Sequence, residues 1–150
     1  MKPSSIGSPA SSASSGPILH EASFSVPFHL SDPVGVLFFG NIYAVVHTIL
    51  EDWGRQSGAW PLWFGGEGGT AYPIRHSEAD YFRFMKYGEA FGVTIRVASL
   101  SDSTIKFETE FAKDGFVHAR VLTVHTAVDL ATHTKTTIAP ELRRYFAGSR

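Results

Sequence analysis

The spacing of apolar residues changes along the chain and divides it into a helical and a sheet-forming part. Between residues 41 and 57 apolar side chains recur three and four positions apart, which predicts one long amphipathic helix. The stripe consists of Ile42, Val45, Val46, Ile49, Leu50 and Trp53. Asn41 is a residue type that caps helix N-termini, and Gly54 and Gly58 are candidate helix ends.

Elsewhere apolar and polar residues alternate, which predicts strands. One strand is expected over residues 21–30, where Pro27 indicates a sheet edge. Further strands are expected at 72–84, 91–98, 105–112 and 116–129, with a short one near 135–138 and a terminal helical turn from Pro140. Asp114-Gly115 predicts a tight hairpin. The pattern therefore predicts an α+β fold, with one long helix packed on a mostly antiparallel sheet of about six strands.

Composition narrows the class of protein. With 43% hydrophobic residues and 13% aromatic ones, 150 residues suffice for one domain with a sizeable core. Residues 1–19 are rich in Ser, Pro and Gly and are predicted to be a disordered tail, which leaves residues 20–150 as the single domain. A net charge of −1 argues against nucleic-acid binding, and no apolar stretch reaches the roughly 20 residues of a membrane span. The absence of cysteine fits a reducing cytoplasm.

The candidate chemistry lies between residues 30 and 43. Asp32 stands on an Asp-Pro turn, Gly35 follows, and an apolar run leads to Asn41 at the start of the helix. This order predicts a carboxylate beside a helix N-terminus, whose free N–H groups stabilise negative charge. A carboxylate next to an oxyanion site suits the hydrolysis of an activated ester. Asp32 as a plain turn residue is the alternative interpretation.

Residues 30–43 (LSDPVGVLFFGNIY) resemble the hotdog-fold acyl-CoA thioesterases of the 4-hydroxybenzoyl-CoA thioesterase type. Residues 72–81 (YPIRHSEADY), 87–89 (YGE) and 139–142 (APEL) resemble later parts of that family, so that the likeness covers residues 21–146. It implies that Asp32 is the catalytic acid and that the backbone N–H of Phe39 polarises the thioester carbonyl, with the N–H of Gly40 as a further donor. Two departures concern the substrate: Leu30 stands where many relatives have a second acid, and Glu89 replaces an Asp.

The resemblance implies an acyl-CoA substrate, with an aromatic acyl group such as hydroxybenzoyl or dihydroxynaphthoyl. It also implies a homodimer or homotetramer with the active site between subunits. A thioester is already activated, so the reaction needs no metal and no cofactor. Asp32 either attacks the carbonyl or activates a water molecule, and the sequence leaves both open.

Other candidates have structural alternatives. Trp60, Trp63 and Phe64 interrupt a glycine-rich loop over residues 58–70 and either pack locally or line an acyl pocket. Asn41 is interpreted as a helix cap, with a substrate contact as the alternative. His76 is interpreted as a hydrogen-bonded structural histidine, with a place facing the active site as the alternative.

Two other functions compete with hydrolysis. A non-catalytic hotdog module that binds acyl-CoA or acyl carrier protein is the main one, because a fold does not fix a function. The presence of Asp32 favours the enzyme. A hotdog dehydratase is disfavoured, because no glycine-framed Asp is followed at short range by a histidine.

Overall fold

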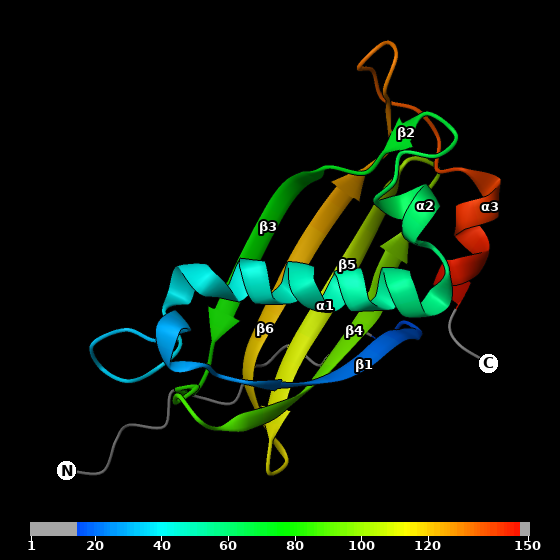
Figure 1. Ribbon diagram of the computed structural model, residues 1–150. Coiled ribbons are helices and arrows are strands. Elements are labelled where there is room, and N and C mark those ends of the chain that lie inside the picture. Colours follow the sequence, from blue (N-terminus) through cyan, green and yellow to red (C-terminus); the bar gives the residue numbers. More distant parts are fainter. Residues whose placement is uncertain (1–14, 148–150) are drawn as a thin grey trace.

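The computed structural model describes residues 15–147, and Figure 1 shows one long helix lying across an antiparallel sheet. The helix is α1 (Ile42–Ser57). The main sheet has the order β1-β4-β5-β6-β3, with the bounds β1 (Ile18–Ser25), β3 (Ile74–Tyr81), β4 (Ala90–Leu100), β5 (Thr104–Lys113) and β6 (Phe116–Thr126). Every neighbouring pair in it is antiparallel. This is the architecture that the alternating pattern predicts.

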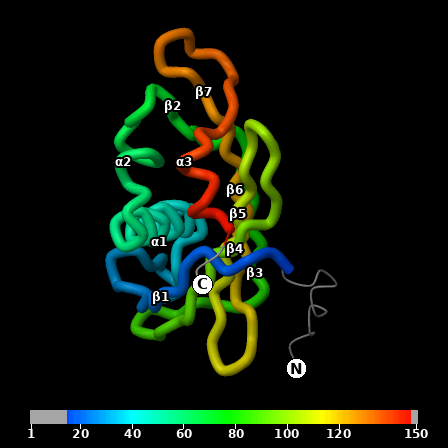
Figure 2. The backbone as a smooth tube through the Cα atoms, turned by 90° about the vertical axis from the view of Figure 1, so that its right-hand side faces the viewer, coloured from blue at the N-terminus to red at the C-terminus, as the bar shows by residue number. Residues whose placement is uncertain are grey.

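Smaller elements cover the end of the sheet beyond the C-terminal half of α1. They are α2 (Trp60–Trp63), the two-stranded sheet of β2 (Thr70–Ala71) and β7 (Val128–Asp129), α3 (Pro140–Arg143) and a 3-10 turn at Arg144–Ala147. Figure 2 shows α1 and α2 on one side of the main sheet, with β2 and β7 extending past its end. The molecule therefore has two layers, with the core between α1 and one face of the sheet.

The long helix follows its apolar stripe. The side chains of the stripe, from Ile42 to Trp53, are all buried. The helix ends at Gly58, whose φ of 84° lies in the left-handed region that glycine adopts without steric cost. Gly54 does not end the helix; it lies inside it, where a Cβ would come within 3.1 Å of the Phe64 ring. The predicted helix is confirmed to within one residue at its start.

Aromatic rings fill the core at the C-terminal end of α1. Trp53 stacks on Phe146 with 5.8 Å between ring centroids, and Trp63 stacks on Tyr72 at 4.7 Å. Phe107 contacts both tryptophans from β5. Burying one such side chain contributes roughly 1.5–3 kcal/mol, so this cluster is a main source of stability.

The other face of the sheet is polar. Arg120 of β6 lies 3.8 Å from a carboxylate oxygen of Glu108 and 3.2 Å from one of Glu110, both on β5. All three side chains are partly buried, so their charges are matched within the sheet surface. Alternation of period two therefore separates a buried apolar face from a charged one.

The strands differ in detail from the prediction. β1 starts at Ile18, so that Ile18 and Leu19 of the expected tail belong to the domain, while residues 1–14 lie outside the described residues. β1 ends at Ser25, and Phe28 falls in a 3-10 turn with 77% of its side chain exposed. Near residues 135–138 the chain forms only a single bridge, between Val128 and Lys135. The main sheet accordingly has five strands instead of about six.

Candidate active site

Residues 30–38 form a tight hairpin before the helix. The N–H of Asp32 donates to the carbonyl of Val36 at 2.9 Å, and the N–H of Gly35 donates to the carbonyl of Asp32 at 2.9 Å. Gly35 has a φ of 86°, which few other residues adopt. The N–H of Phe38 closes the hairpin on the carbonyl of Leu30 at 2.9 Å. These bonds hold the Asp32 turn against the residues that start α1.

The Asp32 carboxylate has one engaged and one open oxygen. Its Oδ1 accepts the N–H of Val34 at 2.9 Å and, more weakly, that of Val36 at 3.4 Å. Oδ2 accepts no hydrogen bond from residues 15–147. Asp32 is thus a turn residue through one oxygen, while the other is available to a substrate or a water molecule.

The helix begins with unpaired donors. A 3-10 turn at Phe39–Asn41 leads into α1. The N–H groups of Phe39 and Gly40 donate to no acceptor within the described part of the chain. First-turn N–H groups carry a partial positive charge, which suits a developing oxyanion.

Asn41 does not cap the helix, contrary to the prediction. Its side chain makes no capping bond; instead Nδ2 donates to the carbonyl of Leu30 at 3.0 Å. That carbonyl also accepts the N–H of Phe38. Asn41 therefore ties the start of α1 to the residue that precedes the Asp32 turn, a contact between positions eleven residues apart that local pattern does not reveal.

An exposed group of apolar side chains surrounds this hairpin, and we call it the aromatic rim. Its members are Phe28, Val34, Phe38, Phe39, Phe84 and Tyr87, all exposed. Phe28 and Tyr87 meet edge to face at 5.6 Å. The segment after β3 reaches the hairpin because the N–H of Leu37 donates to the carbonyl of Met85 and that of Tyr87 to the carbonyl of Gly35. Sequence reasoning missed this rim, although Phe38-Phe39 was a signal for it.

The predicted acyl-pocket residues lie far from the Asp32 hairpin; they are Trp60, Trp63 and Phe64. In Figure 1 α2 lies over the C-terminal half of α1, and the segment of residues 30–38 lies at its N-terminal end. Trp63 is buried in the core, and Phe64 packs on Trp60 at 4.6 Å and on His47 at 5.5 Å. Within one chain these three residues are not brought together with Asp32.

His76 also lies apart from Asp32. It is exposed on β3 and pairs with Val124 of β6, so its side chain points to the sheet face opposite α1. Its Nε2 is 3.7 Å from a carboxylate oxygen of Glu78, and it is not the hydrogen-bonded structural histidine of the prediction.

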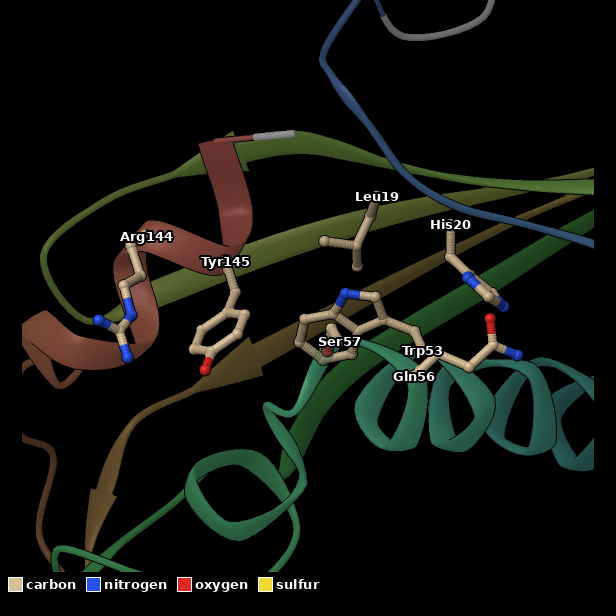
Figure 3. Close-up of a pocket in the computed structure, with 7 residues that line it drawn as sticks. All are labelled: Leu19, His20, Trp53, Gln56, Ser57, Arg144 and Tyr145. Atoms are coloured by element: carbon tan, nitrogen blue, oxygen red, sulfur yellow. The ribbon is translucent and has the colours of Figure 1, made fainter. Parts of the chain in front are cut away.

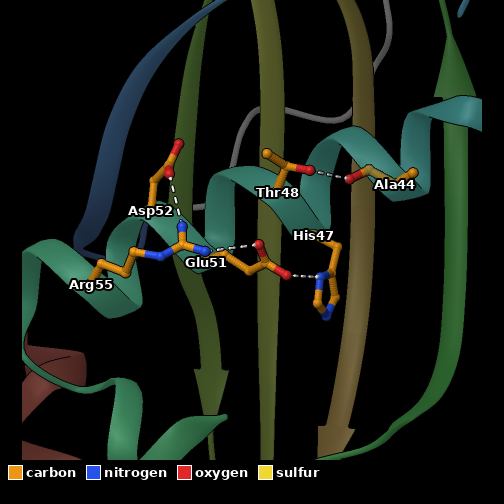
Figure 4. Close-up of polar contacts among 6 residues, drawn as sticks. All are labelled: Ala44, His47, Thr48, Glu51, Asp52 and Arg55. Carbon is orange, nitrogen blue, oxygen red and sulfur yellow. Dashed lines mark hydrogen bonds and ion pairs between the residues drawn. The ribbon is translucent and has the colours of Figure 1, made fainter.

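Figure 4 shows a chain of polar contacts on the exposed side of α1. His47 Nδ1 is 3.3 Å from Glu51, and Arg55 is 3.4 Å from both Glu51 and Asp52. These are ordinary helix-surface pairs with three- and four-residue spacing. No group of three or more His, Cys, Asp or Glu within residues 15–147 could hold a metal ion.

A hollow of about 310 Å³ lies at the other end of α1 (Figure 3). Its walls come from β1, the last turn of α1 and the 3-10 turn after α3: Leu19, His20, Trp53, Gln56, Ser57, Arg144 and Tyr145. Trp53, the first residue of α1 that lines the hollow, lies eleven residues after Ile42, so roughly 16 Å of helix separates this hollow from the Asp32 hairpin. The hollow is therefore not part of the candidate active site.

A single long helix packed on an antiparallel sheet is the architecture of hotdog-fold thioesterases. The family model of the thioesterase-like superfamily matches residues 26–146, and the chain belongs to this family. A 1,4-dihydroxy-2-naphthoyl-CoA hydrolase of Nostoc punctiforme is 22% identical over 126 residues, which are 84% of this chain and 85% of that protein. One of Gloeothece citriformis is 28% identical over 102 residues, 66% of this chain and 71% of that protein.

Solved structures agree on the fold. A 1,4-dihydroxy-2-naphthoyl-CoA thioesterase from Synechocystis superposes with a TM-score of 0.72 at 19% identity, covering 84% of this chain and 93% of that one. A gentisyl-coenzyme A thioesterase superposes with a TM-score of 0.70 at 18% identity, covering 85% of this chain and 100% of that one.

Among the helices of residues 15–147, none has both the length and the apolar character that a membrane crossing requires.

Proposed function

We propose that the chain hydrolyses acyl-CoA thioesters to a free acid and CoA, with Asp32 as the catalytic carboxylate. The observation that carries this proposal is the Asp32 hairpin, where a carboxylate with one open oxygen is tied to a helix start with two unpaired N–H donors. A thiolate is a good leaving group, because an ordinary thiol has a pKa of about 8.5. The site therefore needs only a nucleophile or base and an oxyanion donor.

Two courses of the reaction fit these groups. As nucleophile, Asp32 Oδ2 attacks the thioester carbonyl, CoA leaves as the thiolate, and water hydrolyses the resulting anhydride. As general base, Asp32 takes a proton from the water that attacks the carbonyl, and the thiolate leaves from the tetrahedral intermediate. In both, the N–H groups of Phe39 and Gly40 hold the oxyanion, and loss of one such donor typically costs about 2.7–4 kcal/mol in the transition state.

The acyl group is proposed to be aromatic, as in a hydroxybenzoyl or dihydroxynaphthoyl thioester. The aromatic rim beside Asp32 supports this, because aromatic rings contact one another favourably. The Nostoc and Gloeothece relatives are 1,4-dihydroxy-2-naphthoyl-CoA hydrolases, which supports a dihydroxynaphthoyl group in particular.

A homodimer or homotetramer with the active site between subunits belongs to the same proposal. β3 is an edge strand with most of its residues exposed, and such an edge favours pairing with a second copy. Light scattering should therefore find no stable monomer, and a fully active 16.4 kDa species would contradict this assembly.

A cytoplasmic location also belongs to the proposal, and the cysteine-free sequence supports it.

Asp32→Asn tests the reaction, with release of free thiol measured across aromatic and aliphatic acyl-CoAs. We expect kcat to fall at least about 100-fold, while the turn and its hydrogen bonds persist. Asp129→Asn is the matched control, because Asp129 accepts the N–H groups of Ala131 and Thr132 in a similar turn away from the hairpin.

Two results would overturn the proposal. Wild-type turnover in Asp32→Asn would remove Asp32 from the mechanism. Tight binding of acyl-CoA or acyl carrier protein without any thiol release would favour the alternative of a non-catalytic binding module.

A further inference from the structure

Tyr81 reaches the start of α1 from the far end of β3. Its hydroxyl donates a hydrogen bond to the backbone carbonyl of Phe39, across 42 positions in sequence. That carbonyl also accepts the N–H of Ile42 from the first helical turn. The contact links the edge strand of the sheet to the peptide that carries one of the unpaired donors.

The strand fixes where this hydroxyl lies. Tyr81 pairs with Ala119 of β6, which is buried against the core, so the Tyr81 side chain stands on the same side of the sheet as α1. Directly after it the N–H groups of Phe82 and Arg83 both donate to the carbonyl of His118, at 2.8 and 3.1 Å, and end the strand. Tyr81 is thus held at the point where β3 passes the helix start.

The contact has a geometric consequence for the next residue. The carbonyl of Phe39 and the N–H of Gly40 belong to one planar trans peptide and point in opposite directions. A hydrogen bond that holds the oxygen therefore sets the direction of the N–H. The same bond polarises the peptide and strengthens the N–H as a donor.

The hydroxyl is suited to this task over a wide pH range. Partial burial, and to a smaller extent the nearby Tyr43, raise the pKa of Tyr81 above its usual value. The group therefore remains a protonated donor at neutral pH.

We propose that Tyr81 is a positioning residue for thioester hydrolysis, which aims the Gly40 N–H at the oxyanion by holding the Phe39 carbonyl. This inference rests on the proposed function. Tyr81 touches neither substrate nor reacting atoms in this role; it acts through the peptide.

Tyr81→Phe is the test, with Tyr43→Phe as the matched control. Tyr43 lies in the first turn of α1 near Tyr81, and its hydroxyl makes no hydrogen bond within residues 15–147. For Tyr81→Phe we expect kcat to fall about tenfold while KM stays within about twofold, because the bond aims a donor that matters mainly in the transition state. Tyr43→Phe should leave both constants at their wild-type values.

A second readout does not depend on turnover. The ¹⁵N resonance of Gly40 reports on hydrogen bonding at the Phe39 carbonyl, since both belong to the same peptide. It should shift in substrate-free Tyr81→Phe and stay in place in Tyr43→Phe. The melting temperature of Tyr81→Phe should change little, because Tyr81 is 42% exposed, the ring stays in place and the change removes one atom.

The outcomes separate the two proposals. If the wild type is active, either of two results for Tyr81→Phe overturns the role of Tyr81 but not the proposed function. One is an unchanged kcat, and the other is a fall in kcat without a shift of the Gly40 resonance. A wild type that releases no thiol from any acyl-CoA overturns the proposed function and this inference with it.

Discussion

The two ends of α1 carry the same kinds of residue in opposite environments. At the C-terminal end Trp53 and Trp63 are 3% and 5% exposed and meet edge to face in a cluster of packed rings. At the N-terminal end Phe39 and Phe84 are 65% and 68% exposed around a carboxylate and free backbone donors. Exposed apolar clusters rimming a polar group mark binding surfaces, whereas buried rings mark stability. The difference teaches that aromatic residues indicate a site only where the fold leaves them uncovered.

The largest expected effect is a difference in stability between variants at the two ends of α1. Trp63→Ala should lower the free energy of unfolding by about 3–5 kcal/mol, because it leaves a cavity among tightly packed rings. Phe39→Ala should change it by less than about 0.5 kcal/mol, since that side chain is exposed and the backbone N–H remains. Urea unfolding of both variants is the measurement. Equal destabilisation would mean that the rim is part of the core.

The buried end should also be sensitive to acid. His125 lies against Trp63 and Phe107, and its Nδ1–H donates to the carbonyl of Tyr72 at 2.9 Å. Burial lowers the pKa of His125 to about 4. In the unfolded chain an ordinary histidine takes up its proton near pH 6.5, before the folded protein does. The folded state is therefore favoured above pH 6.5 and loses this advantage as pH falls towards 4, by about 3 kcal/mol in all.

Urea unfolding at several pH values, at constant ionic strength, measures this loss. His125→Gln should flatten the dependence between pH 6.5 and 4, since glutamine does not titrate. His29→Gln is the control, because His29 is exposed, and it should keep the wild-type slope. A wild-type slope in His125→Gln would assign the acid sensitivity to other groups.

A smaller effect concerns the tie between Asn41 and Leu30. Asn41→Ala removes this bond and should lower stability by about 1 kcal/mol, together with a fall in kcat, because the Asp32 hairpin is no longer held at the helix start. Thr48→Ala removes a comparable bond, from its Oγ1 to the carbonyl of Ala44, on the exposed side of the helix (Figure 4). It should leave kcat unchanged. Equal kcat in both variants would contradict a role for the tie.

The smallest effect concerns the choice of acyl group. Phe84→Ser should raise KM for an aromatic acyl-CoA several-fold more than for acetyl-CoA, since a partly exposed ring contributes less than full burial. Trp60→Ala removes a ring at the other end of α1 and should leave the ratio of the two KM values unchanged. A shift of that ratio by Trp60→Ala alone would return the acyl pocket to residues 58–70.

Local signals explain what the sequence could predict. The helix has its stripe and its glycine end, and the Asp114-Gly115 hairpin has positive φ at both residues, 51° and 78°, as the dipeptide indicates. The Asp32 turn was visible because the bonds that form it span at most four residues. Each of these features is decided within a few neighbouring positions.

Non-local contacts explain what could not be predicted. Asn41 is a good cap by type, but its side chain binds a carbonyl eleven residues away. Tyr81 meets Phe39 only after β3 has taken its place at the sheet edge. The burial of Trp63 depends on the rings of Phe107 on β5 and Phe146 in the C-terminal turn. The sequence pattern within residues 58–70 does not show these distant contacts.

The unpaired donors at the start of α1 belong to the main chain, so most substitutions cannot remove them. Any amino-acid substitution at positions 39 and 40 other than one to proline keeps an N–H there. Even an alanine at Gly40 meets nothing closer than the Phe38 ring, at 3.1 Å from its Cβ. A systematic alanine scan would therefore leave both N–H donors in place, and only proline substitutions at positions 39 and 40 would remove them.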